Sequence, residues 1–440
     1  MSAAALAGVL TAQQSSLPPQ PQADKLPAPG TGTPKPSRPV PKPEGAAPTA
    51  PSGFKVVSYA VLQGPRMMVY APNGDLFVSS PGTNSITVLR DKNNDGVFEE
   101  RSVYASGPVQ SLLPTAQAGG GRGAGATPFG ARGAVLGADA PACTPPPAFV
   151  ERGAGTLAAP FGMAFHDGYL YVGNPGSIVR YKYKDGDLKA QGEPEKLLEL
   201  PTGGHSTRNI VFNRAGTKMY VAVGSQSNND AGEDCRRAAI LEFNPDGTGY
   251  RIYASGIRNP VGLALQPGTD KIWIAMNERD NYGDDLVPDF ATSVKDGGFY
   301  GWPYSYIGKN YDPRYIGSFP ELVNRAIVPD VLIPSHSAAL GMAFYTGDKF
   351  PQRYRNGGFV ALHGSWNRSA AAGYKVIFFS MKGGKPGPIE DFLTGFLASN
   401  GENNTPIQQW GRPVGVTVSR DGGLLVSDDS GNRIWKVSAN

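Results

Sequence analysis

Two short polar clusters carry the residue types best suited to chemistry. The first, at 203–209, reads Gly-Gly-His205-Ser-Thr-Arg208-Asn209, and the second, at 256–260, reads Gly-Ile-Arg258-Asn259-Pro. Each cluster places a cation and an amide beside glycine at the start of an apolar run, where side chains project from a loop rather than fill a core. If the clusters converge, one His, two Arg and two Asn form a pocket for an anionic ligand that carries a carbonyl group.

A repeated pair of short apolar strands must position these clusters. Each repeat consists of an apolar strand, a turn built on glycine, and a second strand of aromatic and branched residues. The six pairs are 67–70 with 76–78, 162–165 with 169–172, 210–212 with 219–221, 262–265 with 272–274, 341–344 with 358–361, and 414–418 with 424–426. The chain also holds 58 Gly and 40 Pro, which suits frequent chain reversal. The pattern predicts an all-β fold, a six-bladed β-propeller of four-stranded antiparallel blades.

Composition divides the chain near residue 53. Residues 1–53 are predicted to be a partial signal-like segment followed by a disordered, proline-rich tether, because the tether holds almost no large apolar side chains. Residues 54–440 form the predicted propeller domain, and the strand-like segment 54–62 is expected to join the last blade and close the ring. A Gly/Ala/Pro-rich stretch at about 114–155 is predicted to be a low-complexity insertion. The signal-like start predicts a periplasmic or secreted location.

Charge and cysteine content exclude several classes of protein. A net charge of +4, from 41 basic and 37 acidic residues, does not favour nucleic-acid binding, and no run reaches the roughly 18 apolar residues that a membrane span needs. The two cysteines, Cys143 and Cys235, do not lie in a Cys-x-x-Cys-His motif, which excludes a covalently attached c-type haem. They form a disulfide in an exported protein or remain two unpaired thiols, and both alternatives stay open.

Five motifs in one order resemble a known family. They are Gly-Gly-His205-x-x-Arg208-Asn209, Gly256-x-Arg258-Asn259-Pro260-x-Gly262, Asn277-Glu278-Arg279-Asp280-Asn281-x-Gly283-Asp284-Asp285, Gly297-Gly298-x-Tyr300-Gly301-Trp302-Pro303 and Gly341-Met342-Ala343-Phe344-Tyr345-x-Gly347. Together they resemble the soluble pyrroloquinoline quinone (PQQ)-dependent sugar dehydrogenases, the glucose/sorbosone dehydrogenase family, and most closely its sorbosone dehydrogenase-like branch. The resemblance covers about residues 54–440.

The resemblance implies a propeller that holds PQQ and calcium at one end of its central axis. It also implies an oxidoreductase that oxidises a sugar hydroxyl or aldehyde and passes electrons to an external acceptor, a cytochrome or a quinone. His205 falls on the family's general base, which takes the hydroxyl proton while hydride passes to the quinone. Ser225 stands where the glucose dehydrogenases have an acidic residue that orients this His.

The same resemblance assigns residues to the cofactor. Arg258 and Asn259 match the family's cofactor-binding pair, and Arg412 resembles a second cofactor arginine; a planar guanidinium suits the carboxylates and the carbonyl of PQQ. Arg208 and Asn209 belong to the loop of His205 and are expected to support it. Trp366 and its neighbour His363 stand where glucose dehydrogenases place a cofactor lysine, and the Trp366 ring is a candidate to stack on the quinone.

Two segments are candidate calcium sites. The resemblance places the cofactor calcium at Asp280 and Asn281, where glucose dehydrogenases have Gly-Pro. A separate loop spaces Asp91, Asn93, Asp95 and Glu99 as a possible second calcium site, although Ser102 stands where an EF-hand has its last Glu. A plain Asx-rich turn explains that loop equally well.

Two other functions fit the same fold. A propeller hydrolase of the lactonase type would use calcium on the axis without a quinone. A non-catalytic carbohydrate- or protein-binding propeller would keep the scaffold and lack activity.

Overall fold

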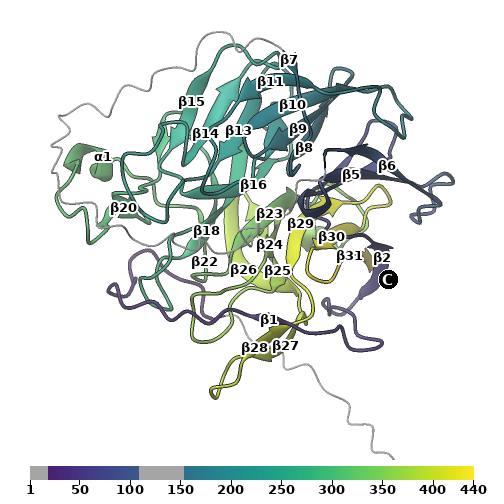
Figure 1. Cartoon of the computed structure of the whole chain (residues 1–440). Helices are drawn as coiled ribbons and strands as arrows, with labels where there is room; N and C mark the ends of the chain where they lie inside the picture. The colour runs from purple at the N-terminus through teal and green to yellow at the C-terminus, as the bar shows by residue number, and fades with distance from the viewer. Residues whose placement is uncertain (1–17, 109–152) are drawn as a thin grey trace, which may run out of the picture.

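A computed structural model describes residues 18–108 and 153–440 (Figure 1). Within these ranges the regular secondary structure is almost entirely β-strand, with one short α-helix, α1 (Pro320–Asn324), and two 3₁₀ turns, η1 (Pro81–Thr83) and η2 (Gln352–Tyr354). The predicted low-complexity insertion lies almost wholly outside the described residues, and so does Cys143. No helix of the described part has the length and apolar character needed to cross a membrane.

Six sheets of four or five strands contain most of the strands in the described chain. The first three, in hydrogen-bonded order, are β3 (Met68–Tyr70), β4 (Leu76–Ser80), β5 (Ser85–Arg90) and β6 (Glu100–Ser106); β8 (Met163–His166), β9 (Tyr169–Asn174), β10 (Ser177–Lys182), β11 (Glu195–Glu199) and β7 (Gly153–Ala154); and β12 (Ile210–Phe212), β13 (Met219–Val223), β14 (Ala239–Phe243), β15 (Arg251–Ser255) and β19 (Gly298–Phe299). The other three are β16 (Asn259–Leu265), β17 (Ile272–Asn277), β18 (Asp289–Ser293) and β22 (Val331–Ile333); β23 (Ala339–Phe344), β24 (Gly358–Leu362), β25 (Lys375–Lys382) and β26 (Lys385–Leu393); and β29 (Pro413–Val418), β30 (Leu424–Asp428), β31 (Arg433–Ala439) and β2 (Phe54–Val61).

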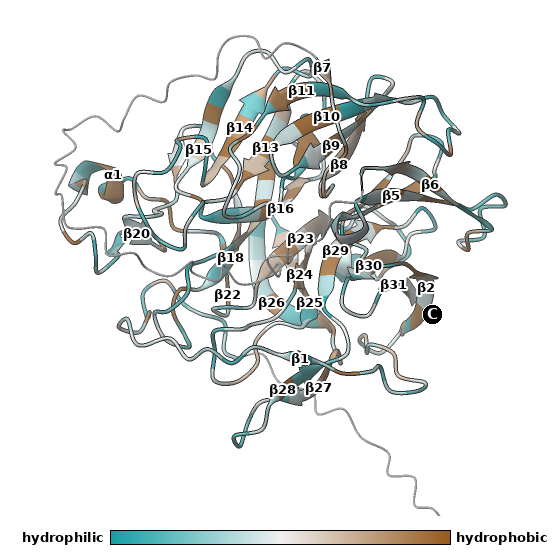
Figure 2. Ribbon diagram, in the orientation of Figure 1, coloured by the Kyte–Doolittle hydropathy of each residue, from teal (hydrophilic) through white to brown (hydrophobic). Residues whose placement is uncertain are grey.

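Smaller elements decorate these sheets. They are β20 (Ser305–Tyr306) with β21 (Asn310–Tyr311), and β1 (Arg38–Pro39) with β28 (Ile407–Gln409) and β27 (Leu397–Asn400). Hydrophobic segments concentrate in the inner strands such as β13, β16 and β24, whereas many of the connecting loops are hydrophilic (Figure 2). Buried apolar clusters lie between neighbouring sheets, as expected for stacked blades.

The first strands of the six sheets form a ring. They contact one another in the order β3, β8, β12, β16, β23 and β29, and β29 contacts β3 again. Glycine makes this close approach possible: a side-chain carbon on Gly262, Gly341 or Gly415 would collide with a backbone carbonyl oxygen of the next first strand or the residue leading into it. The recurring glycine in the sequence therefore marks the packing of each sheet on the next, and the fold is of the propeller type.

The predicted closure of the ring by residues 54–62 is confirmed. Strand β2 pairs antiparallel with the C-terminal strand β31, from Phe54 opposite Ala439 to Val61 opposite Arg433. The Phe54 ring packs edge-on against Phe350 and Phe392, with centroid distances of 4.7 and 5.3 Å. The last sheet thus combines both ends of the described body.

Removing this closure is expected to destabilise the whole body. Phe54→Ala alone should lower the free energy of unfolding by about 2 kcal/mol, because a partly buried aromatic ring loses its packing. Urea denaturation measures the change, with Lys55→Ala, an exposed neighbour in the same strand, as the control. Equal stability of the two variants would show that β2 does not hold the ring closed.

The prediction of a disordered tether is wrong for residues 18–53. This segment lies along the body, and β1 pairs parallel with β28 (Figure 1). Backbone hydrogen bonds join Val40 N to Gln409 O at 2.9 Å and Thr49 to Thr394 in both directions at 2.8 and 2.9 Å. The segment has no core of its own, but backbone donors and acceptors on an existing surface order it without one.

Candidate functional site

The predicted site residues gather at one end of the ring. In an antiparallel sheet, the loop that enters the first strand and the loop that leaves the second strand lie at the same end. His205 and Arg208 precede β12, Arg258 precedes β16, and Arg412 precedes β29. Ser225 follows β13, Asp280 and Asn281 follow β17, and Trp366 follows β24. The loop that carries Asp91 and Glu99 joins β5 to β6 and therefore lies at the other end.

Backbone contacts bring the two polar clusters together. The backbone N–H of His205 donates to the carbonyl of Ser225 at 3.0 Å, and the N–H of Ser225 donates to the carbonyl of Arg258 at 2.7 Å. A side chain at Gly224 would lie 2.5 Å from Asn259 Oδ1 and 2.7 Å from His205 Cβ. Glycine at this position therefore lets the predicted base and the predicted cofactor amide approach each other.

His205 has one ring nitrogen held and one free. Its Nδ1 lies 2.9 Å from the carbonyl oxygen of Ser225 and 3.1 Å from Ser225 Oγ. A carbonyl only accepts, so Nδ1 carries the proton and Nε2 keeps a lone pair that contacts no described donor. Burial, together with the charge of Arg258, lowers the pKa of His205 to about 3, which keeps the ring neutral. Ser225 thus orients this imidazole without an acidic partner.

Arg208 and Asn209 build the loop that carries His205. The buried Arg208 guanidinium donates to the carbonyl oxygens of His205, Thr207 and Pro201, each at 2.8 Å. Asn209 donates to the carbonyl of Val261 at 3.0 Å. Both side chains therefore bond backbone groups, whereas Arg208 Nε has no partner among the described residues, and the supporting role of the two residues stays a prediction.

Arg258 is anchored by neighbouring loops, whereas Asn259 leaves one atom unused. Arg258 donates to Asn228 O and Oδ1 at 2.9 Å each, and to Glu278 O at 2.7 Å. Asn259 is 8% exposed, and its Oδ1 has no hydrogen-bond partner among the described residues. This oxygen is itself inaccessible and lies against Gly224, where an added β-carbon would come within 2.5 Å of it, so its lack of a donor does not present it to a ligand.

A second cationic group lies around Arg412. Arg412 donates to the carbonyl oxygens of His363 and Gly364 at 2.9 and 3.0 Å. His363 Nε2 bonds Asp429 at 2.9 Å, and Arg66 pairs with the same carboxylate at 2.6 Å. Burial, with Arg412 beside it, lowers the pKa of His363 to about 4. Although burial opposes it, His363 and Arg66 hold the pKa of Asp429 below its usual range.

Sequence reasoning missed Arg66 and Asp429. Arg66 precedes the first strand of its sheet, as Arg258 and Arg412 do, so the repeat position was a usable signal. Asp429 directly follows a second strand, but its partners lie far away in the sequence. Trp366, by contrast, is half-exposed at this end, and its carbonyl accepts from the backbone N–H of Lys35 at 2.7 Å.

Asp280 and Asn281 do not present a free set of oxygens for calcium. Asp280 Oδ1 lies 3.1 Å from His336 Nδ1, and Asp280 Oδ2 lies 3.7 Å from Arg258. Asn281 Oδ1 accepts from Asn367 at 2.6 Å. The carbonyl oxygens of residues 280, 282 and 283 also accept hydrogen bonds, from Asn228 Nδ2, Gly30 N and His336 Nε2 at 3.0, 2.7 and 2.8 Å. Because calcium needs six to eight oxygen ligands, the predicted cofactor-calcium residues do not fit that ion as they stand.

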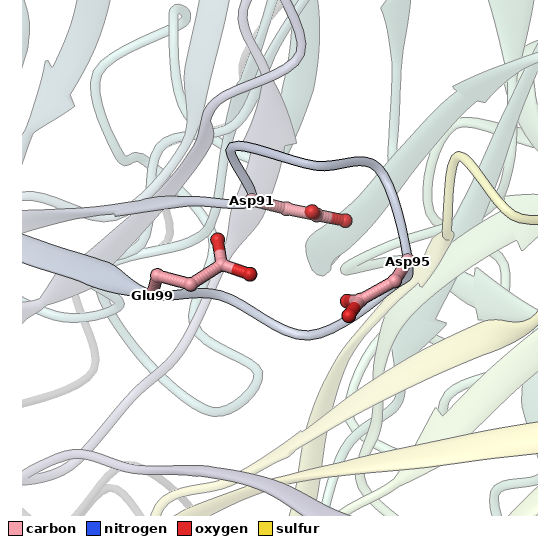
Figure 3. Close-up of side chains that lie close together, drawn as sticks. All are labelled: Asp91, Asp95 and Glu99. Carbon is pink, nitrogen blue, oxygen red and sulfur yellow. The ribbon is translucent and has the colours of Figure 1, made fainter.

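The second predicted calcium loop brings its acidic side chains together. The ligand atoms of Asp91, Asp95 and Glu99 lie within 4.8 Å of one another (Figure 3). Asn93 turns its amide to Asp95 at 3.1 Å, and each carboxylate also accepts a backbone N–H of the loop, as in an Asx-rich turn. Calcium binding by this loop stays a prediction, and the loop is not part of the site at the opposite end.

The fold and the site define a class: a β-propeller with a neutral histidine and an arginine cluster at one end of its ring. Two family models match, "Glucose / Sorbosone dehydrogenase" over residues 173–366 and "TrAA12-like" over residues 323–440. An uncharacterised protein of Borreliella burgdorferi is 32% identical over 300 residues, which covers 64% of this chain and 76% of that protein. The chain belongs to the glucose/sorbosone dehydrogenase family, a family of PQQ-dependent sugar oxidoreductases.

A named relative agrees with this assignment, and a solved structure agrees with the fold. The PQQ-dependent pyranose dehydrogenase of Coprinopsis cinerea is 34% identical over 338 residues, covering 61% of this chain and 44% of that protein. The chain thus spans less than half of this relative's length. The holo PQQ domain of pyranose dehydrogenase from C. cinerea has a TM-score of 0.66 and 19% identity, covering 90% of this chain and 98% of that domain. At that identity the structural likeness shows the fold alone.

Proposed function

We propose that this protein is a six-bladed propeller dehydrogenase that uses PQQ to oxidise a sugar hydroxyl or aldehyde, of the sorbosone or aldose type. It passes the electrons to a separate acceptor, a cytochrome or a quinone, and works in the periplasm or outside the cell. The observation that carries the proposal is the free Nε2 of His205, whose Nδ1 is held by Ser225 and whose ring lies within the field of Arg258. Family membership and the pyranose dehydrogenase relative support the substrate class.

The residues at this end of the ring fit an anionic quinone. PQQ carries three carboxylates, and Arg258, Arg412 and Arg66 surround the end of the axis with positive charge. Burial is the main reason that the pKa values of His205 and His363 are lowered, and in each case a neighbouring arginine disfavours the protonated ring further. Arg412 uses Nε and Nη2 on backbone carbonyls, and its Nη1 donates to none of the described groups, so this N–H remains for a ligand.

Bound PQQ supplies the electrophilic carbonyl that accepts hydride from the sugar carbon. The chain supplies the proton acceptor: His205 Nε2 takes the hydroxyl proton while Ser225 holds Nδ1–H. A pKa of about 3 makes the free imidazole a weak base. Burial is the first cause of this low pKa and the charge of Arg258 the second; an anionic group bound beside Arg258 offsets only the second. No step is assigned to calcium, since the predicted ligands do not fit it.

Titration of the purified protein with PQQ tests the proposal. We expect saturable quinone absorbance and dye reduction with aldoses, measured with calcium and with a chelator so that a metal requirement is read separately. Lactone hydrolysis without quinone would support the lactonase-type alternative, and absence of PQQ binding and of activity would support the non-catalytic one.

Arg258→Ala is expected to weaken PQQ binding by about 10- to 100-fold, because the planar guanidinium is lost from the anionic site. Its dissociation constant is measured in the same titration. Arg214→Ala serves as the control, since Arg214 is exposed and lies in the turn before β13 at the opposite end. Equal affinity of the two variants would contradict the role of Arg258.

A further inference from the structure

The N-terminal segment crosses two loops of the candidate site. We call residues 32–37 the strap, residues 278–288 the β17–β18 loop and residues 363–374 the β24–β25 loop. The strap's Lys35 donates its backbone N–H to the carbonyl of Trp366 at 2.7 Å, and Pro34 forms an isolated bridge with Asn367. Thr33 hydrogen-bonds Asp284 on the other loop. One short segment therefore touches both loops at once.

The two loops also bond each other directly beneath the strap. Asn367 Nδ2 donates to Asn281 Oδ1 at 2.6 Å, and Arg368 pairs with Asp285 at 2.8 Å. The β17–β18 loop carries Asn281, and the β24–β25 loop carries Trp366, both predicted to lie near the cofactor. The strap therefore contacts both members of a pair of hydrogen-bonded site loops, which come from neighbouring sheets.

Residue 32 has no room for a side chain. A β-carbon on Gly32 would lie 2.6 Å from Asn281 Oδ1, 3.0 Å from Asn281 Cα and 3.1 Å from Asn367 Oδ1. The backbone atom Asn281 Cα cannot move aside as a side-chain tip can, and Asn281 Oδ1 is held by Asn367. An alanine at position 32 would therefore require the Asn281 side chain to move away from Asn367 and the two backbones to separate slightly.

The strap contributes placement more than global stability. Its residues are exposed or half-exposed, and it contacts the loops mainly through hydrogen bonds, each worth about 1 kcal/mol net. Such a segment restricts the conformations of the loops below it. A ligand that binds those loops then avoids the entropy cost of ordering them.

We propose that the strap is a positioning element of the cofactor site: it fixes the loop of Trp366 against the loop of Asn281 before PQQ binds. The inference rests on the proposed function, because it assigns the strap to the binding of that cofactor. This segment, which the sequence analysis predicted to be disordered, is thus proposed to be an ordered part of the cofactor site.

The test uses a single added methyl group. Gly32→Ala should raise the PQQ dissociation constant about 10-fold, with the melting temperature of the cofactor-free protein changed by no more than about 2 °C. Deletion of residues 1–37 should raise the dissociation constant at least as much, but it also removes Leu26, which packs against the core, so the stability comparison uses Gly32→Ala alone. Gly82→Ala is the matched control, since Gly82 lies at the same end of the ring and a β-carbon there meets no atom within 4 Å. Its affinity should equal that of the wild type.

The outcomes separate the strap from the proposed function. If the wild type binds no PQQ, the proposed function fails and the strap has no cofactor site to position. If the wild type binds PQQ and Gly32→Ala binds it equally well, the inference about the strap is overturned while the function stands. A lower melting temperature with unchanged affinity would also overturn it, because the strap would then act on stability alone.

Discussion

Replacing His205 by alanine is expected to lower sugar oxidation by about 10²- to 10⁴-fold while the PQQ dissociation constant changes by less than about threefold. The side chain's described hydrogen bonds are those between Nδ1 and Ser225, and the imidazole is half-buried, so its removal leaves the surrounding loop in place. The substitution removes Nε2, the atom proposed to accept the hydroxyl proton. Single-turnover measurement of quinone reduction at saturating sugar separates this chemical step from cofactor binding.

His166→Ala is the control for this substitution. His166 lies in β8, and its ring stacks on Phe212 with a centroid distance of 4.4 Å, next to a turn glycine at the other end of the ring. It should leave turnover unchanged. Near-normal turnover in His205→Ala would show that another group takes the proton, and His363, whose Nδ1 is buried without a partner among the described residues, would be the next to replace.

The fold was predictable because the close packing of neighbouring first strands selects glycine at the same place in several repeats. Gly262, Gly341 and Gly415 each sit where the next first strand approaches too closely for a side chain, so the residue type recurs with the structural unit. The closing strand β2 was visible as a strand without a repeat partner. The strap was not predictable, because its order depends on a surface formed by residues more than 240 positions away.

The site was predictable only where its residues lie close together in sequence. The loop of His205 and the pair Arg258-Asn259 are local motifs that the fold then brings together. The contact between Arg66 and Asp429 joins positions 363 apart, and no local pattern encodes it. Asp280 was predicted as a calcium ligand from its place in a motif, whereas in the structure it bonds His336, which lies in a different loop.

Arg279→Met is expected to lower the free energy of unfolding by about 3–5 kcal/mol. The Arg279 side chain is fully buried and pairs with Glu278 at 3.0 Å and Asp312 at 2.9 Å, and both carboxylates are themselves 0% exposed. It also donates to Ser305 O at 2.7 Å. Without the guanidinium, the buried Glu278 loses its paired cation, and Asp312 keeps only Arg314, whose Nε lies 3.5 Å from Oδ1. Urea denaturation with a fixed m-value measures the loss.

A surface pair and a double variant show whether burial is the cause. Arg353→Ala removes an exposed partner of Glu390, with side chains 55% and 46% exposed, and should cost less than about 1 kcal/mol. Asp312→Asn combined with Arg279→Met should cost less than the sum of the two single changes, because the second removes a charge that the first left uncompensated. Additive losses would mean that Arg279 stabilises through packing against Tyr306 rather than through charge.

Arg279 also links the β17–β18 loop to residues 303–312. The loss of charge pairing there should therefore loosen the loop that carries Asp280, and the PQQ affinity of the same variant measures that coupling.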